Sequence, residues 1–232
     1  MSAKHISDEY NNQSLYPHII LDDFLDPTLA KQAALESRDL VDDYKDMGSE
    51  PFTHENQIQK FSICDATELS PALRLISSYI NGNEFMVFLR KVTRMSLLRG
   101  DPSLRGGGLH FTRRGGKLDV HHDFNFIGDS RQPKAYRKCN LIIFLNETWE
   151  KSWGGNLELW DKELTHAHYS VPPRFNRAVL FNIEDAPHGH PHPLECPITE
   201  CRRSLAYYFY DDTPVNNRLY HRAHWKSGKE LV

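Results

Sequence analysis

The second half of this chain is a succession of short β-rich runs that are separated by Gly, Pro, Asn and Asp residues. The runs begin after Gly100-Asp101-Pro102, and no helical segment of the βαβ type lies between them. A parallel, doubly wound sheet is therefore disfavoured, because its strands need helical crossovers. Many short strands at this spacing predict a mainly β fold, either a sandwich or a jelly roll. The clearest runs cover residues 139–145, 157–160, 178–183 and 204–210.

The first hundred residues have a more helical pattern. Asp26-Pro27 offers an N-cap followed by proline at the first helical position, which predicts a helix from 27 to about 37. Ser70-Pro71 repeats this signal, and Asn83 predicts the cap of a third helix with apolar residues on one face. We therefore expect one domain over residues 1–232. Residues 1–100 would supply helical support and an initial strand, residues 101–215 the jelly-roll core, and residues 216–232 a tail.

Composition narrows the class of partner and the compartment. The formal net charge is −3, and no long block of Lys or Arg occurs, so neither nucleic acid nor a membrane surface is expected as a partner. The N-terminus carries no apolar signal-peptide run, and no stretch of about 18 apolar residues predicts a membrane span. Four unevenly spaced cysteines predict no disulfide framework, which favours a reducing, cytoplasmic location.

The 13 histidines concentrate in two patches, which suggests a metal site. His121 and Asp123 follow a strand-like run, and residues at i and i+2 of a strand point to the same face, so His122 would point away. His188 lies sixty-five positions beyond Asp123, after another apolar run. Two histidines and one carboxylate on one side of an ion leave positions open for an oxidant and a co-substrate, which suits Fe(II) oxygenase chemistry.

A fixed cation follows the second histidine patch. Fourteen residues after His188, Arg202 opens another apolar strand, with Ser204 two positions further on. A guanidinium group can hold the far carboxylate of a dicarboxylate co-substrate through two parallel hydrogen bonds, while the 2-oxo acid end chelates the metal. Neighbouring Arg203 is the alternative. Strand alternation groups Arg203 with bulky residues and Arg202 with the short side chains Ser204 and Ala206, so Arg202 is expected to face the interior.

These motifs, in this order, resemble the prolyl-4-hydroxylase-like branch of the 2-oxoglutarate/Fe(II)-dependent dioxygenases. The resemblance covers roughly residues 105–211 and extends more loosely to residues 16–25. The motifs that carry it are His121-X-Asp123, Leu145-Asn146-X-X-Trp149, Gly154-Gly155-X-Leu157, Pro173-X-Phe175-Asn176-Arg177, His188-Gly189 and Arg202-X-Ser204.

The resemblance implies a double-stranded β-helix (jelly roll) that is buttressed by N-terminal helices, as a single catalytic domain. It implies that His121, Asp123 and His188 hold Fe(II) and that Arg202, with Ser204 beside it, binds 2-oxoglutarate. O2 would be the oxidant, succinate and CO2 the co-products, and ascorbate a candidate stimulant. The reaction implied is hydroxylation of a C–H bond, with a prolyl or other peptidyl residue among the candidate targets. Because Asp123 is present instead of a small residue, hydroxylation is favoured over halogenation.

Several alternatives remain open at this stage. A free small molecule could replace the peptide as substrate, and a cupin-like metal- or sugar-binding module would share the fold without turnover. A zinc hydrolase with the same three ligands is a further alternative. Within the chain, His110 is expected to be structural, and Arg137 is expected to stand at an exposed strand start instead of the substrate side. A zinc site built from His190, His192 and the nearby cysteines is disfavoured, and the second co-substrate contact, the oligomeric state and the tail are not assigned.

Overall fold

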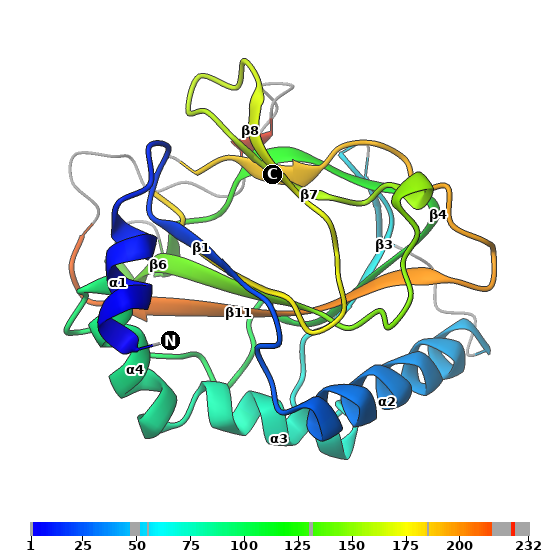
Figure 1. Cartoon of the computed structure of the whole chain (residues 1–232), viewed down its shortest axis with the longest axis horizontal. Coiled ribbons are helices and arrows are strands. Elements are labelled where there is room, and N and C mark those ends of the chain that lie inside the picture. Colours follow the sequence, from blue (N-terminus) through cyan, green and yellow to red (C-terminus); the bar gives the residue numbers. More distant parts are fainter. Residues whose placement is uncertain are drawn as a thin grey trace.

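The computed structural model describes residues 2–46, 52–54, 56–129, 132–184, 186–214 and 224–225 (Figure 1). The helices are α1 (Ala3–Asn11), α2 (Pro27–Asp46), α3 (Pro71–Ile80) and α4 (Asn83–Thr93), with a short 3-10 helix at Lys151–Trp153. The strands are β1 (His18–Leu21), β2 (Phe52–His54), β3 (Gln57–Ile63), β4 (Gly108–His122), β5 (Phe126–Asp129), β6 (Gln132–Phe144), β7 (Leu157–Trp160), β8 (Ala167–Val171), β9 (Ala178–Asn182), β10 (His188–His190), β11 (Cys201–Asp211) and β12 (His224–Trp225).

The strands form one curled antiparallel sheet. Its main path runs β1-β9-β6-β11-β4-β10-β7-β8, and β3, β5 and β12 pair with strands of this path. Strand β4 belongs to both layers, because its first half pairs with β11 and its second half with β10. The bend lies at Gly115, whose φ of 74° is accessible to glycine at little cost. The predicted jelly roll is confirmed.

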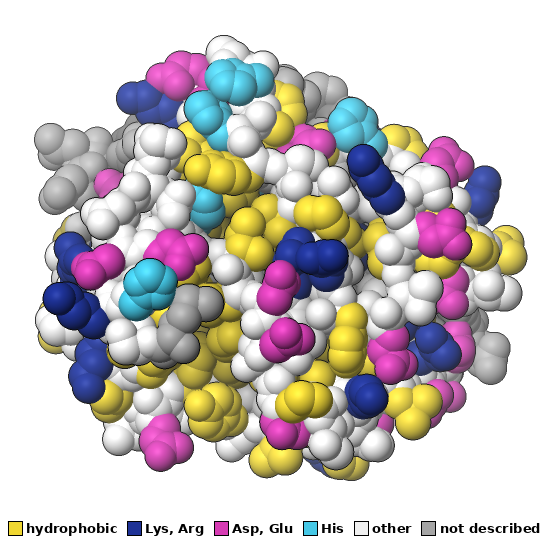
Figure 2. Space-filling view, viewed as in Figure 1, with side chains coloured by type: hydrophobic (Ala, Val, Ile, Leu, Met, Phe, Trp, Pro, Cys, Tyr) yellow, Lys and Arg dark blue, Asp and Glu magenta, His cyan; other side chains and the backbone are white. Residues whose placement is uncertain are grey.

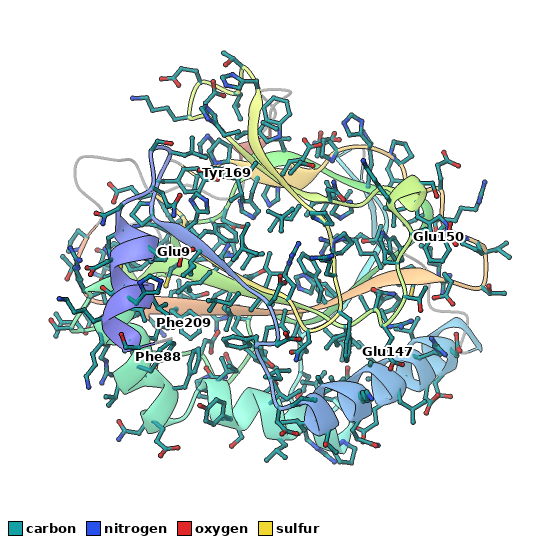
Figure 3. The ribbon with its side chains drawn as sticks, in the orientation of Figure 1. Glu9, Phe88, Glu147, Glu150, Tyr169 and Phe209 are labelled. Atoms are coloured by element: carbon teal, nitrogen blue, oxygen red, sulfur yellow. The ribbon has the colours of Figure 1, made fainter. Side chains whose placement is uncertain are left out.

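The helices cover the outer face of the layer that contains β6 and β11 (Figure 1). Leu205, Tyr207 and Phe209 alternate along β11 and join the same buried cluster as Leu73 and Leu89 of the helices. Phe209 projects from β11 towards the helical side, where its ring lies 6.3 Å from that of Phe85 (Figure 3). Burial of this apolar face, at about 25 cal/mol per Å², stabilises the layer and leaves the other face of β11 for a cavity.

Two details of the N-terminal half differ from the sequence prediction. Helix α2 continues to Asp46 instead of ending near residue 37, because the first Gly or Pro after Pro27 is Gly48. The Asp26 side chain caps this helix as expected, since its Oδ1 accepts hydrogen bonds from the backbone N–H groups of Thr28 and Leu29. In addition, the half contains β2 and β3 besides the initial strand β1. Helix α3 begins at Pro71 as predicted, whereas Gly82, not Asn83, occupies the cap position of α4.

In the part of the chain that the structure describes, no helix has the length and apolarity needed to cross a membrane.

Candidate metal centre

Two neighbouring strands bring the histidines of the predicted triad together. His121 on β4 is the direct antiparallel partner of His188 on β10, and their ring centroids lie 4.7 Å apart. Asp123 follows the end of β4, with Oδ1 3.5 Å from Nε2 of His121 and Oδ2 3.4 Å from Nε2 of His188. One ligand atom from each of the three residues lies within 4.8 Å of the others. The structure therefore gathers all three predicted residues at one point.

Backbone carbonyls orient both imidazole rings. Nδ1 of His121 lies 2.9 Å from the carbonyl oxygen of Asp119, and Nδ1 of His188 lies 3.0 Å from that of Ala186. Since a carbonyl oxygen can only accept a hydrogen bond, each Nδ1 is the donor, and the Nε2 atom of each ring faces Asp123. Burial lowers the pKa of His188 to about 4, so the ring is neutral and able to act as a ligand near pH 7.

The carboxylate of Asp123 is held on one side by two donors. Its Oδ2 accepts hydrogen bonds of 2.7 Å from a terminal nitrogen of Arg137 and 2.7 Å from Nδ2 of Asn140. Burial would raise the pKa of Asp123, but the charge of Arg137, together with His188 and His121, holds it well below its usual range. Oδ1 is thus the oxygen best placed for a metal ion, and Asp123 supplies the negative charge that balances a divalent cation.

Arg137 differs from its prediction. Its side chain is 1% exposed, with the guanidinium carbon 3.3 Å from the ring centroid of Tyr208 and 4.5 Å from that of Phe124. The predicted exposed strand start is wrong, because β6 begins at Gln132 and places Arg137 within the strand. Lys138, in contrast, lies nearer the surface and forms an ion pair of 3.4 Å with Asp211.

A cavity of about 580 Å³ extends from the triad into the sheet. Arg202 lines it, with Nε donating to the carbonyl oxygen of Gly155 at 2.7 Å and the guanidinium carbon 4.9 Å from the ring centroid of Phe144. Ser204 lines the same wall, whereas Arg203 is buried outside the cavity, with its backbone N–H donating to Asn146. The structure thus places Arg202, not Arg203, in the cavity that contains the triad.

The sequence reading missed or undervalued three further residues of this cavity. Lys60 of β3, His110 of β4 and His190 of β10 all line it. Burial lowers the pKa of both histidines well below the usual range, so both rings are neutral near pH 7. His110 had been expected to be structural. Among the described residues, His190 and His192 form no metal-ligand cluster with Cys196 or Cys201.

A second group of two histidines and one aspartate lies on the hairpin between β7 and β8. Asp161, His166 and His168 also have ligand atoms within 4.8 Å of one another. Histidine side chains gather at the upper edge of the molecule, over this hairpin (Figure 2). The His166 side chain is 61% exposed, and the Asp161 carboxylate accepts hydrogen bonds from the Thr165 N–H and hydroxyl groups and from the His166 N–H. The sequence analysis did not single out this group.

Comparisons with known proteins were made for both sequence and structure. Residues 107–210 match the family described as the 2OG-Fe(II) oxygenase superfamily. No curated protein matches the sequence significantly.

Three solved structures illustrate the likeness in fold. A prolyl-4-hydroxylase from Pseudomonas putida has a TM-score of 0.63 at 18% identity, covering 91% of this chain and 100% of that one. A prolyl hydroxylase from Trichoplax adhaerens, in complex with a hypoxia inducible factor peptide fragment, has a TM-score of 0.61 at 17% identity over 90% and 91%. The epimerase SnoN, in complex with Fe3+, alpha ketoglutarate and nogalamycin RO, has a TM-score of 0.58 at 12% identity over 99% and 95%.

Proposed function

We propose that this enzyme, whose residues 107–210 match the 2OG-Fe(II) oxygenase superfamily, hydroxylates a C–H bond of a peptidyl substrate. One O2 would oxidise both the substrate and 2-oxoglutarate, which gives the alcohol, succinate and CO2. His121, Asp123 and His188 would hold Fe(II), and Arg202 would bind the distal carboxylate of 2-oxoglutarate with Ser204 beside it.

The observation that carries the proposal is that one cavity is lined by both the triad and Arg202. The donor set fits Fe(II): two imidazole nitrogens and one carboxylate oxygen lie on one side, which leaves the remaining positions to a bidentate co-substrate and O2. Arg202 also fits a carboxylate. Within the described part of the chain only its Nε is hydrogen bonded, so its two terminal nitrogens are available for a ligand.

Each residue has a distinct task in this mechanism. Bound Fe(II) supplies the activation of O2 and of the 2-oxo acid, which side chains alone cannot provide. Arg202 fixes the co-substrate through charge-assisted hydrogen bonds and so sets the distance of its 2-oxo acid end from the triad. Arg137 and Asn140 hold one oxygen of Asp123 and direct the other towards the ion.

The peptidyl substrate is supported by the apolar part of the cavity lining and by the fold. Phe124, Phe126 and Ile127 line the cavity that contains the triad, which suits an apolar ring or side chain. Two of the structural neighbours are prolyl hydroxylases, and one of them was solved with a peptide fragment. A prolyl residue is therefore the first target to test, followed by other residues of a peptide.

The proposal is tested by measuring succinate formation from 2-oxoglutarate with anaerobically loaded Fe(II) enzyme, after addition of O2. The screen would cover proline-containing peptides, free amino acids, nucleosides and sugars, and Asp123→Ala would be the control. We expect a peptide to raise the rate of succinate formation, with a matching gain of one oxygen by mass spectrometry. Stimulation by a small molecule alone would replace the peptidyl assignment. Absence of any succinate would instead favour a binding module, and hydrolysis of a substrate with Zn(II) would favour a hydrolase.

A further inference from the structure

Lys60, Thr112 and Arg202 form a row across three adjacent strands. Thr112 of β4 is the direct antiparallel partner of Lys60 on β3 and, at its other edge, of Arg202 on β11. Direct antiparallel partners place their side chains on the same face, and all three residues line the cavity. The backbones of Lys60 and Arg202 are thus two strand spacings apart, about 10 Å, which two long side chains can bridge towards one ligand.

An irregularity in β3 determines that Lys60 faces inward. Gln57 lines the cavity, so regular alternation would turn residue 59 inward and residue 60 outward. The register between β3 and β4 shifts between Ile58 and Lys60, and Gln59 has a φ of 51°, in the left-handed region that a non-glycine residue rarely adopts. This bulge restores Lys60 to the cavity face. Bulges of this kind commonly re-aim a side chain next to a functional site.

The two cations lack an internal counter-charge. The ammonium group of Lys60 makes no hydrogen bond or ion pair within the part of the chain that the structure describes, and among the described residues that line the cavity only Asp123 is acidic. Oδ2 of Asp123 is already held by Arg137 and Asn140. Burial lowers the pKa of Lys60 to about 8, an effect to which the charge of Arg202 contributes while Cys64 and Asp123 oppose it.

We infer that Lys60 is a second cationic anchor for the distal carboxylate of the co-substrate, on the other side of Thr112 from Arg202. This inference rests on the proposed function, because it assigns a residue to the 2-oxoglutarate site. The ligand carboxylate supplies the counter-charge that the cavity walls lack, so binding relieves the repulsion between Lys60 and Arg202. The arrangement also favours the ligand-bound protein, since two neighbouring cations without a counter-charge destabilise the ligand-free fold.

Calorimetric titration of the metal-loaded protein without O2 separates this role from a structural one. We expect Lys60→Met to weaken 2-oxoglutarate binding by about tenfold or more. Binding of 2-oxopentanoate, which has no distal carboxylate, should change less than twofold. Lys117→Met is the matched control: Lys117 is on the neighbouring strand β4, pairs with Asp119 at 2.7 Å and does not line the cavity. This variant should retain the affinity of the wild type.

Thermal unfolding of the ligand-free protein provides the second readout. Lys60→Met should raise Tm, because it removes a partly buried cation that has no counter-charge, whereas a lysine with a packing role would lower Tm on substitution. An unchanged 2-oxoglutarate affinity in Lys60→Met, or an equal loss for both ligands, would overturn the inference. If the wild-type protein itself fails to bind 2-oxoglutarate, the proposed function fails, which is a distinguishable result.

The pH dependence of binding identifies the group. The titratable and charged groups that face Lys60 are Cys64, which directly follows β3, and His110, Asp123, His190 and Arg202. Since an anion binds the protonated amine, wild-type affinity for 2-oxoglutarate should fall as the pH rises above about 8, where free Lys60 loses its proton. Lys60→Arg keeps its charge and should retain affinity there. An identical decline in Lys60→Arg would assign the titration to another group and contradict this role.

Discussion

Two groups among the described residues have the same composition, two histidines and one aspartate, and in each the ligand atoms lie within 4.8 Å of one another. The group on β4 and β10 is largely buried, with side-chain exposures of 8%, 11% and 6% for His121, Asp123 and His188. On the β7–β8 hairpin, His166 is 61% exposed. The distances between the ligand atoms therefore do not distinguish the two groups. The burial and hydrogen bonding of the ligand residues do.

The decisive difference lies in how the carboxylates are used. Asp123 has Oδ2 bound by Arg137 and Asn140, which leaves Oδ1, 3.5 Å from Nε2 of His121, without a donor from these two residues. Both oxygens of Asp161 accept hydrogen bonds from the backbone or side chain of the loop that it closes. Asp161 thus shapes a turn, in the way aspartates commonly do, whereas Asp123 is pre-oriented as a ligand. The comparison predicts metal binding at the first group alone.

The largest expected difference is between substitutions of the two aspartates, Asp123 and Asp161. Asp123→Gly should lower Fe(II) affinity at least a hundredfold and abolish hydroxylation, because a neutral ligand replaces the anionic oxygen. Asp161→Ala should leave Fe(II) affinity unchanged and destabilise the fold by about 1 kcal/mol through loss of its turn hydrogen bonds. Anaerobic Fe(II) titration of both variants checks this. Retained hydroxylation in Asp123→Gly would break the comparison.

The next largest effect is expected on 2-oxoglutarate affinity, through Arg202 in the wall of the cavity. Arg202→Ala should cost about 3 kcal/mol of 2-oxoglutarate binding, roughly a hundredfold in Kd, through loss of charge-assisted hydrogen bonds. Arg203→Ala should leave this affinity within a few fold, because Arg203 lies outside the cavity. Titration of 2-oxoglutarate against both variants measures the difference. A loss confined to Arg203→Ala would reverse the assignment.

The dependence of the free energy of unfolding on pH reports on the buried histidine His188. Burial lowers the pKa of His188 to about 4 in the folded protein, below the value of about 6.5 in an unfolded chain. The unfolded state therefore takes up protons first as the pH falls, and metal-free protein should lose up to about 3 kcal/mol between pH 7 and pH 4. Denaturant unfolding at several pH values measures this slope. His188→Gln should flatten it, and an unchanged slope would show that His188 is not responsible.

A smaller effect on Fe(II) affinity is expected from substitution of Arg137, which donates a hydrogen bond to Asp123. Arg137→Met should lower Fe(II) affinity about tenfold, since it frees one side of the carboxylate and reduces the fixed orientation of the ligand. Lys138→Met is the matched control, because Lys138 lies next in sequence but pairs with Asp211 near the surface. Competition with a coloured chelator gives both affinities. Equal affinities would mean that Asn140 alone orients Asp123.

The sequence predicts those parts of the site that follow regular strand alternation. His121 and Asp123 two positions apart, and Arg202 on the side of Ser204 instead of Leu205, were placed correctly relative to the cavity. Lys60 was missed and Arg137 was wrongly predicted to be exposed for a common reason. Bulges between Ile58 and Lys60 and between Phe209 and Tyr210 shift the register beside these residues, so simple alternation gives no indication of where they face.

The hairpin group eluded the sequence analysis for a different reason. Its residues meet because the loop from 161 to 166 folds back, and the sequence of that loop carries no metal-ligand spacing. Likewise, the polar segment from Gln57 to Ile63 gave no strong strand signal, and its strand forms through pairing with β4.

Anomalous diffraction at the iron edge, from crystals grown anaerobically with Fe(II) and 2-oxoglutarate, tests the central claim most directly. We predict a single strong peak about 2.0–2.2 Å from Nε2 of His121, Nε2 of His188 and Oδ1 of Asp123, with Oδ2 still bound to Arg137. The distal carboxylate should lie against Arg202. A peak at Asp161, His166 and His168, or a peak near the triad without Asp123 as a ligand, would contradict the account.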